Sequence, residues 1–439
     1  TLDMRGDGLI EFVVTDAVSG VVSGPNGESL ASYVSNTGTL QADGGMVTLT
    51  ANAATDIIKS VVNNEGVIRA QSMTERNGVV VLSGGPEGIV SVSGTVDVSG
   101  TDAGEKGGRV QATGQYVGLF GATVNASGDA GGGTVLVGGD YQGKNPDVQN
   151  AFHTYVSPDS TINADAITSG NGGKVIVWSD AVTRAYGRIT ARGGSQSGDG
   201  GFIETSGHYL DVGVAPDASA PHGKAGTWLL DPSNVTITTA TANFDTLAAT
   251  PAAGTTTYSP VETDTAANTA TINAATINAA LDAGTNVIVD TVSAGTAEAG
   301  NITVSSAISK TTGADVTLTL DTSPTTAGAI AINQSISSTS GKLGVTLKAG
   351  ATSGTVSFGA SGSITSLSGN VVISAPGGTV GLRSIDTGAS GTLTVTAGGA
   401  ITQSGVLTVG GAATFAAGSG NNITLDSANN FSTVAITSG

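Results

Sequence analysis

The feature that most constrains this chain is a short β-type segment that returns about every 28 residues. Each copy starts at Gly or Thr and carries one aliphatic residue at its centre. The centres in the first half are Leu40, Ile68, Val96, Val124, Ile162 and Ile189, at spacings of 28, 28, 28, 38 and 27 residues. Such a period is typical of a solenoid, in which each unit buries its apolar side chains against its neighbours.

A second segment follows the later copies and indicates where each unit turns. It opens with a pair of Gly residues, at Gly107-Gly108, Gly132-Gly133, Gly172-Gly173 and Gly200-Gly201. Because Gly adopts positive φ without steric cost, we expect these pairs to supply the positive φ of a turn. Apolar residues then alternate with polar or small ones, which is the two-residue period of a strand.

The second half repeats this design with three segments in each unit. The centres run from Ile302, Ile308 and Val316 through Ile330, Ile336 and Val345 to Val356, Ile364 and Val372. Later units are shorter, with centres at Val380, Ile401 and Ile423 that lie 21 and 22 residues apart. Three short strands in each turn of about 21–28 residues predict an all-β triangular coil, with like residues stacked ~4.8 Å apart.

The composition agrees with a narrow coil and excludes some partners. The 439 residues include 67 Gly and no Cys, with only 8 Phe, 7 Tyr and 2 Trp. A thin interior accepts ladders of small and aliphatic residues but few rings. The net charge of −18 disfavours nucleic acid and anionic membranes, since both require clustered Lys and Arg. No apolar run approaches the ~18 residues of a membrane span, so we expect no membrane insertion.

The pattern divides the chain into three parts. Residues 1–210 predict one β-helix segment, in which a loop insertion at 140–150 accounts for the 38-residue spacing. Residues 211–270 hold five of the 11 Pro and lack the pattern, which predicts an irregular junction or excursion. Residues 271–439 predict a continuing β-helix segment, and a short helix is expected at 277–283.

Several motifs resemble a known family. They are Gly172-Gly-Lys-Val-Ile-Val-Trp-Ser-Asp180, Gly187-Arg-Ile-Thr-Ala-Arg-Gly-Gly194, Gly200-Gly-Phe-Ile-Glu-Thr-Ser-Gly-His208 and Gly223-Lys-Ala-Gly-Thr-Trp-Leu-Leu-Asp-Pro232, in that order. Together they are similar to the core of filamentous-haemagglutinin-type exoproteins, which include high-molecular-weight adhesins of the two-partner secretion pathway. The resemblance covers roughly residues 38–320, and beyond them only the general repeat character supports it.

The resemblance implies a right-handed parallel β-helix, adhesion, and a secreted or bacterial cell-surface location. It also implies export through an outer-membrane transporter partner, which would act on a region that this chain does not contain. A biofilm-matrix adhesin, holding cells to exopolysaccharide and to each other, is one member type that fits; virulence is the wider role of such adhesins. Because no signal peptide opens the chain at Thr1, we expect a fragment of a longer protein.

No residue pattern points to catalysis. A β-helical polysaccharide lyase or hydrolase would need a carboxylate pair or a carboxylate–metal group on one face. We expect turn or surface positions for the scattered His153, His208 and His222. Solvated or turn-capping roles are expected for Asp140, Asp180, Glu204 and Asp231. We therefore expect no enzyme activity, no cofactor and no metal site.

Two places are candidates for partner binding. Arg5, Gly6 and Asp7 form the tripeptide that integrins recognise, with an ordinary turn as the competing interpretation. Asp140, Tyr141 and Lys144 lie in the insertion. The rings of Trp178 and Trp228 favour core packing over a platform for sugars.

The leading hypothesis is a secreted bacterial filamentous adhesin, whose rigid β-helical rod attaches to cells, surfaces or matrix polysaccharide. Its partner would be a glycan, an exopolysaccharide or a protein receptor on a host or bacterial surface. Binding would come from inserted loops or from many weak contacts along the repeats. The alternatives are a β-helical carbohydrate-active enzyme, recognised by turnover of a polysaccharide, and the passenger of a single-chain autotransporter.

Overall fold

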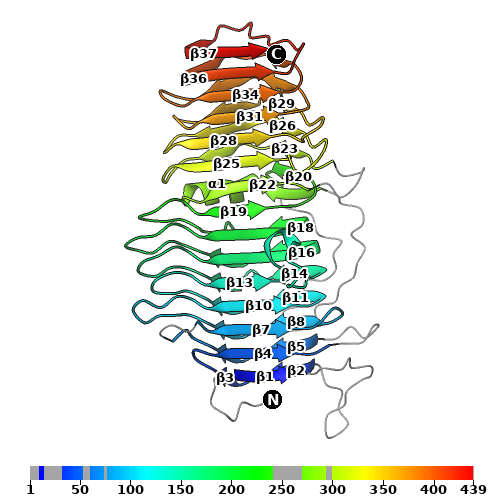
Figure 1. The fold of residues 1–439 in the computed structure, drawn as a ribbon, viewed down its shortest axis with the longest axis vertical. Coiled ribbons are helices and arrows are strands. Elements are labelled where there is room, and N and C mark those ends of the chain that lie inside the picture. Colours follow the sequence, from blue (N-terminus) through cyan, green and yellow to red (C-terminus); the bar gives the residue numbers. More distant parts are fainter. Residues whose placement is uncertain are drawn as a thin grey trace. The chain divides into compact units, whose positions relative to one another are not determined.

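The computed structural model describes residues 9–13, 32–52, 60–73, 77–240, 269–292 and 299–438. They fall into two compact units. The first comprises the described residues up to Gly207 together with Asp211–Trp228. The second comprises His208–Leu210 and the described residues from Leu229 onward. Each unit is a stack of short parallel strands (Figure 1).

The first unit contains three ladders of parallel strands. One ladder runs through β1 (Leu9–Val13), β4 (Met46–Thr50), β7 (Val79–Ser83), β10 (Arg109–Thr113), β13 (Thr134–Val137) and the start of β16 (Lys174–Ala185). A second runs through β2 (Ser32–Asn36), β5 (Ser60–Asn64), β8 (Ile89–Val92), β11 (Tyr116–Leu119), β14 (His153–Val156) and the end of β16. The third contains β3 (Thr39–Gln41), β6 (Val67–Arg69), β9 (Thr95–Asp97), β12 (Thr123–Asn125), β15 (Thr161–Asn163) and β17 (Arg188–Thr190). The strands β18 (Phe202–Val212) and β19 (Thr227–Leu230) follow along the chain.

The second unit has the same design. One sheet holds β21 (Ala270–Asn273), β20 (Val235–Thr238), β23 (Ile302–Val304), β26 (Ile330–Ile332), β29 (Val356–Phe358), β32 (Val380–Leu382) and β35 (Ile401–Gln403) in this spatial order. Another ladder contains β24 (Ile308–Lys310), β27 (Ser335–Ser338), β30 (Ser363–Thr365), β33 (Ser384–Asp386) and the start of β36 (Leu407–Ala417). The third contains β22 (Asn286–Asp290), β25 (Val316–Asp321), β28 (Leu343–Lys348), β31 (Val371–Ala375), β34 (Leu393–Ala397) and the end of β36, and β37 (Asn430–Ser438) pairs along β36.

These ladders confirm the parallel β-helix, with three strands in each turn. The register also confirms the repeat centres of the first half. Leu40 pairs with Ile68, and each later centre pairs with the next, through to Ile162 with Ile189. The 38-residue spacing is therefore one turn of the helix that carries an insertion.

For the second half of the chain, one set of predicted repeat centres is wrong. Val316 pairs with Leu343, and Val345 pairs with Val371, the residue before the expected partner. Val372 points outward and is 37% exposed. Two adjacent valines at 371 and 372 satisfy the strand pattern equally well, and a shift of one residue moves a side chain to the opposite face of a strand.

The expected helix is present as α1 (Ala274–Asp282). It begins three residues before the expected start, because the Asn273 side chain caps it by accepting a hydrogen bond from the backbone of Ala275 at 2.9 Å. The apolar residues Ile277 and Leu281 of this helix are fully buried.

Part of the expected irregular junction is regular. Its described residues, 211–240 and 269–270, include β19, β20 and the start of β21. Val235 of β20 pairs directly with Ala270 of β21. Residues 241–268, which carry the lapse in the repeat, lie outside the described residues.

Candidate binding groove

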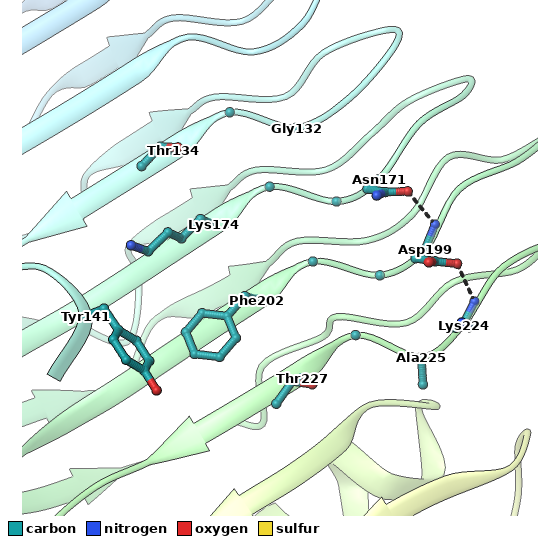
Figure 2. A pocket seen from close by; sticks show the side chains of 16 residues that line it. Gly132, Thr134, Tyr141, Asn171, Lys174, Asp199, Phe202, Lys224, Ala225 and Thr227 are labelled. Atoms are coloured by element: carbon teal, nitrogen blue, oxygen red, sulfur yellow. Dashed lines mark hydrogen bonds between the residues drawn. The ribbon is translucent and has the colours of Figure 1, made fainter.

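The first unit carries an open groove of about 700 Å³ above a strip of stacked glycines (Figure 2). Four successive turns of the β-helix line it. Its floor consists of Gly132, Gly133, Gly172, Gly173, Gly200, Gly201 and Gly226. Tyr141 and Phe202 lie toward one side, and Asn171, Asp199 and Lys224 lie toward the other.

The glycines of the floor are required by the close approach of neighbouring turns. A Cβ on Gly172 would lie 2.0 Å from the carbonyl oxygen of Ala191, and one on Gly200 would lie 1.8 Å from that of Ala218. The expectation that these glycine pairs adopt positive φ is wrong. None of the paired glycines has a positive φ, and positive φ occurs instead at Gly170, shortly before the pair Gly172-Gly173. Glycine is therefore required at these pairs because neighbouring turns stack too closely for a side chain. The result is a strip of backbone that no side chain covers.

The backbone N–H groups of this strip are already hydrogen-bonded. Gly132 donates to the carbonyl oxygen of Asn171 at 3.0 Å, and Gly172 donates to that of Asp199 at 2.9 Å. Gly200 donates in the same way to Lys224 at 2.9 Å. The floor is therefore a closed ladder, and a ligand must be recognised by the side chains around it.

An aromatic pair forms one wall of the groove. The rings of Tyr141 and Phe202 have centroids 5.7 Å apart and planes inclined by 59°. Tyr141 is 45% exposed, whereas Phe202 is half-buried. Phe202 packs on a buried cluster that includes Leu136 and Trp178, so its ring is held in place.

Tyr141 belongs to the insertion, which begins with the short 3₁₀ helix η1 (Tyr141–Gly143). The backbone N–H of Gln142 donates to both carboxylate oxygens of Glu204, at 3.1 and 3.3 Å. Glu204 lies in β18 and is fully buried. The amide of Asn150 donates to Asp180 at 2.9 Å at the far end of the loop. These contacts hold the exposed loop against the stack of turns.

Asp140 fixes the start of this loop. Its carboxylate accepts hydrogen bonds from the Tyr141 backbone at 2.7 Å, from Asn145 at 2.8 Å and from the Lys174 ammonium at 2.6 Å. Burial raises the pKa of Asp140, but these hydrogen bonds outweigh burial and lower the pKa to about 2. Asp140 therefore stays ionised and neutralises the charge of Lys174, which lines the groove.

A polar ladder forms the opposite wall. The backbone N–H of Asp199 donates to Oδ1 of Asn171 at 2.9 Å, and the backbone N–H of Lys224 donates to Oδ1 of Asp199 at 2.8 Å (Figure 2). These two bonds join three successive turns. They leave the amide nitrogen of Asn171, one oxygen of Asp199 and the ammonium of Lys224 for a ligand.

The structure separates the candidate residues named from the sequence. Tyr141 lines the groove, and Asp140 supports the same wall through Lys174. Lys144 is exposed and donates to Oε1 of Gln142 at 2.8 Å, outside the groove lining. Arg5, Gly6 and Asp7 lie outside the described residues.

Sequence reasoning did not assign Phe202, Asn171, Asp199 or Lys224 to a binding site. A usable signal is the polar residue that directly precedes a Gly pair, as Asn171 and Asp199 do. A stack of turns places equivalent positions above one another, so such residues meet on one side of the strip.

Several expectations about single residues need correction. His153 is buried in strand β14, where its ring stacks on Phe152 with centroids 4.8 Å apart. Burial, together with the positive charge of Arg184, lowers the pKa of His153 to about 4. Glu204 and Asp231 are buried carboxylates rather than solvated ones. His153 and Glu204 lie in strand stretches in which successive residues are all buried, and Asp231 directly follows β19, so none of the three reaches solvent.

The two tryptophans are buried. Trp228 is 0% exposed, and its indole N–H donates to the Thr205 hydroxyl at 2.9 Å. Trp178 is 8% exposed and donates to Asp180 at 3.1 Å. Neither ring offers a face for a sugar, so core packing is the correct interpretation.

Two other features, a metal site and a membrane-spanning helix, are absent from the described ranges. No three His, Asp or Glu side chains gather there closely enough to hold a metal ion. Over the same residues, no helix has the length and apolar character needed to cross a membrane.

A family of repeats of unknown function (DUF5649) matches residues 370–438. The match covers the last turns of the second unit and does not extend to the groove. No curated protein matches the chain.

Proposed function

We propose that this chain is the β-helical part of a secreted bacterial adhesin, which attaches to cells, surfaces or matrix polysaccharide. The observation that carries the proposal is the exposed groove beside the insertion. Its walls are held by the buried Glu204 and by the Asp140–Lys174 ion pair, so the surface is pre-organised. A pre-organised surface loses little conformational entropy when it binds.

Adhesion is favoured over polysaccharide cleavage by the state of the nearby carboxylates. A general acid needs a raised pKa, whereas the pKa of Asp140 is lowered to about 2. Glu204 is fully buried below the loop and is held by the backbone of Gln142. Asp199 is the one carboxylate among the described residues that line the groove, whereas hydrolysis of a glycosidic bond ordinarily uses a pair, so the groove supports binding without turnover.

Export through an outer-membrane transporter and a place at the bacterial surface belong to the same proposal. Stacked Gly, Thr and Val turns without Cys are compatible with an exported protein that needs no disulfides. The quoted motifs between Gly172 and Pro232 are the support for two-partner secretion.

The test is an attachment assay with the purified chain coated on an inert surface. Cells of a bacterium that makes this protein are added with their matrix intact or after it has been stripped. The proposal expects attached cells to increase over an uncoated control in a saturable way. Attachment equal to the control in both preparations would contradict it.

A further inference from the structure

The groove over the glycine strip fits one kind of ligand better than others. We propose that it is a binding site for a neutral polysaccharide chain, whose sugar rings stack on Tyr141 and Phe202. This inference rests on the proposed function, because it names the surface and the ligand class through which the adhesin would hold its matrix.

The floor argues against an added peptide strand. A peptide that extends a sheet needs unpaired backbone N–H and C=O groups along an edge. The floor N–H groups of Gly132, Gly172 and Gly200 are already bonded to the next turn. The ligand must therefore be held by stacking and by side chains, which is how a sugar chain is recognised.

The aromatic wall suits the C–H faces of sugar rings. The ring of Tyr141 is 45% exposed, and that of Phe202 is fixed by the cluster below it. The two rings are inclined rather than stacked on each other, so each offers a face or an edge to the groove. Two neighbouring rings can contact consecutive sugars of one chain.

The polar wall suits hydroxyl groups. Asp199 keeps one carboxylate oxygen as an acceptor, and Asn171 keeps its amide nitrogen as a donor. Sugar hydroxyls donate and accept at once, so neighbouring donors and acceptors on one wall match them. The backbone bonds that join Asn171, Asp199 and Lys224 hold these groups in register with the turns.

The charges of the groove balance, which favours a neutral chain over an anionic one. The two ammonium groups of Lys174 and Lys224 equal in number the two carboxylates of Asp140 and Asp199, and Lys174 and Asp140 form an ion pair. The Lys174–Asp140 distance is 2.6 Å, so this pair presents little net charge to a ligand. A chain of uronates would meet Asp199 without a surplus of cations to offset it.

The size and direction of the groove suit a polymer. Its 700 Å³ lies within the ~300–1,000 Å³ of ordinary ligand sites. Four successive turns line it, and strands in neighbouring turns lie ~4.8 Å apart. That step is comparable with the advance of one sugar ring, and no side chain projects from the glycine floor to block the path.

The experiment uses the full chain and a glycan array that carries neutral hexose oligomers, uronate oligomers, sulfated oligosaccharides and extended peptides. The strongest neutral oligomer is then titrated calorimetrically against the wild type, Tyr141→Ala, Phe202→Ala and Asp199→Asn. The matched control is Phe152→Ala, because Phe152 is 39% exposed in the same unit and does not line the groove.

The expected result is binding to neutral oligomers, little affected by salt. Tyr141→Ala and Phe202→Ala should each weaken it about tenfold, through lost ring contacts, while Phe152→Ala leaves it unchanged. Because Phe202 also packs on a buried cluster, the exposed Tyr141 separates lost binding from lost folding. Thermal unfolding of each variant checks the fold.

Three results would overturn the inference: binding only to anionic glycans, binding of peptides in the groove, or neutral-glycan binding that the Tyr141 and Phe202 variants leave intact. If cells still attach to the coated chain in these cases, the adhesin proposal stands and another surface carries it. Loss of both attachment and glycan binding in the wild type overturns both.

Discussion

At the scale of single residues, glycine has two separate roles in this chain. Gly170 supplies positive φ at a turn, whereas Gly172 and Gly200 are glycines because a neighbouring carbonyl oxygen occupies the place of a Cβ. The sequence shows the Gly pairs but cannot distinguish these causes, since the second depends on the distance between turns. The same distance leaves the bare strip on which the groove lies.

Gly200→Ala should therefore destabilise the first unit. A Cβ would lie 1.8 Å from the carbonyl oxygen of Ala218, so the turns must move apart, at a cost of about 2–4 kcal/mol. Gly38→Ala is the matched control, because nothing lies within 4 Å of its added Cβ. Urea unfolding measures both, and equal stability of the two variants would contradict the stacking argument.

His153 should make stability depend on pH. Its pKa falls from 6.5 in the unfolded chain to about 4 in the folded one, so the unfolded state takes up the proton first as the pH falls. The contribution of neutral His153 to the free energy of unfolding should be fully present above pH 6.5. It should decline as the pH falls toward 4, by about 3 kcal/mol in total.

Unfolding free energies across this range, for the wild type and His153→Gln, test the point. The variant should lose this part of the pH dependence. A wild-type curve that is flat between pH 6.5 and pH 4 would contradict burial as the cause of the lowered pKa.

At the scale of elements, the register was predictable and the walls of the groove were not. The aliphatic centres from Leu40 to Ile189 pair as their spacing requires, because only one register stacks all of them inward. The wall that joins Tyr141 to Phe202 brings together residues 61 positions apart through an insertion. Because the insertion does not recur in other turns, the spacing of the repeats cannot predict which residues it contacts.

The insertion should depend on Glu204. Glu204→Gln replaces the carboxyl group by an amide, which weakens the bifurcated hydrogen bond that it accepts from the Gln142 N–H, a contact that contributes about 1.5 kcal/mol. Backbone hydrogen exchange in residues 140–150 should become about tenfold faster or more.

Mass spectrometry of exchange in peptides from this loop measures the effect. Asp147→Asn is the control, because Asp147 is exposed in the same loop. An unchanged exchange rate in Glu204→Gln would contradict the role of Glu204 as the anchor of the loop.

At the scale of the whole molecule, repetition accounts for the composition, and departures from it account for the groove. Gly, Val, Thr and Ala satisfy the requirements of stacked turns, and residues that break the repeat form the walls of the groove. Tyr141 comes from an insertion, and Phe202, Asn171 and Asp199 stand at positions where other turns carry different residues. Candidate functional residues in such a fold are therefore the ones that depart from the repeat. Because the repeat predicts only the stacked strands, the fold was predictable from the sequence and the groove was not.

Binding of a polysaccharide without cleavage is the property that we propose for this chain. The direct measurement mixes purified matrix polysaccharide with the chain, then follows the fraction of protein retained on the polymer and the polymer length over time. We expect saturable retention with unchanged polymer length, and weaker retention of Tyr141→Ala. Shortening of the polymer in proportion to added protein, or no retention at all, would contradict it.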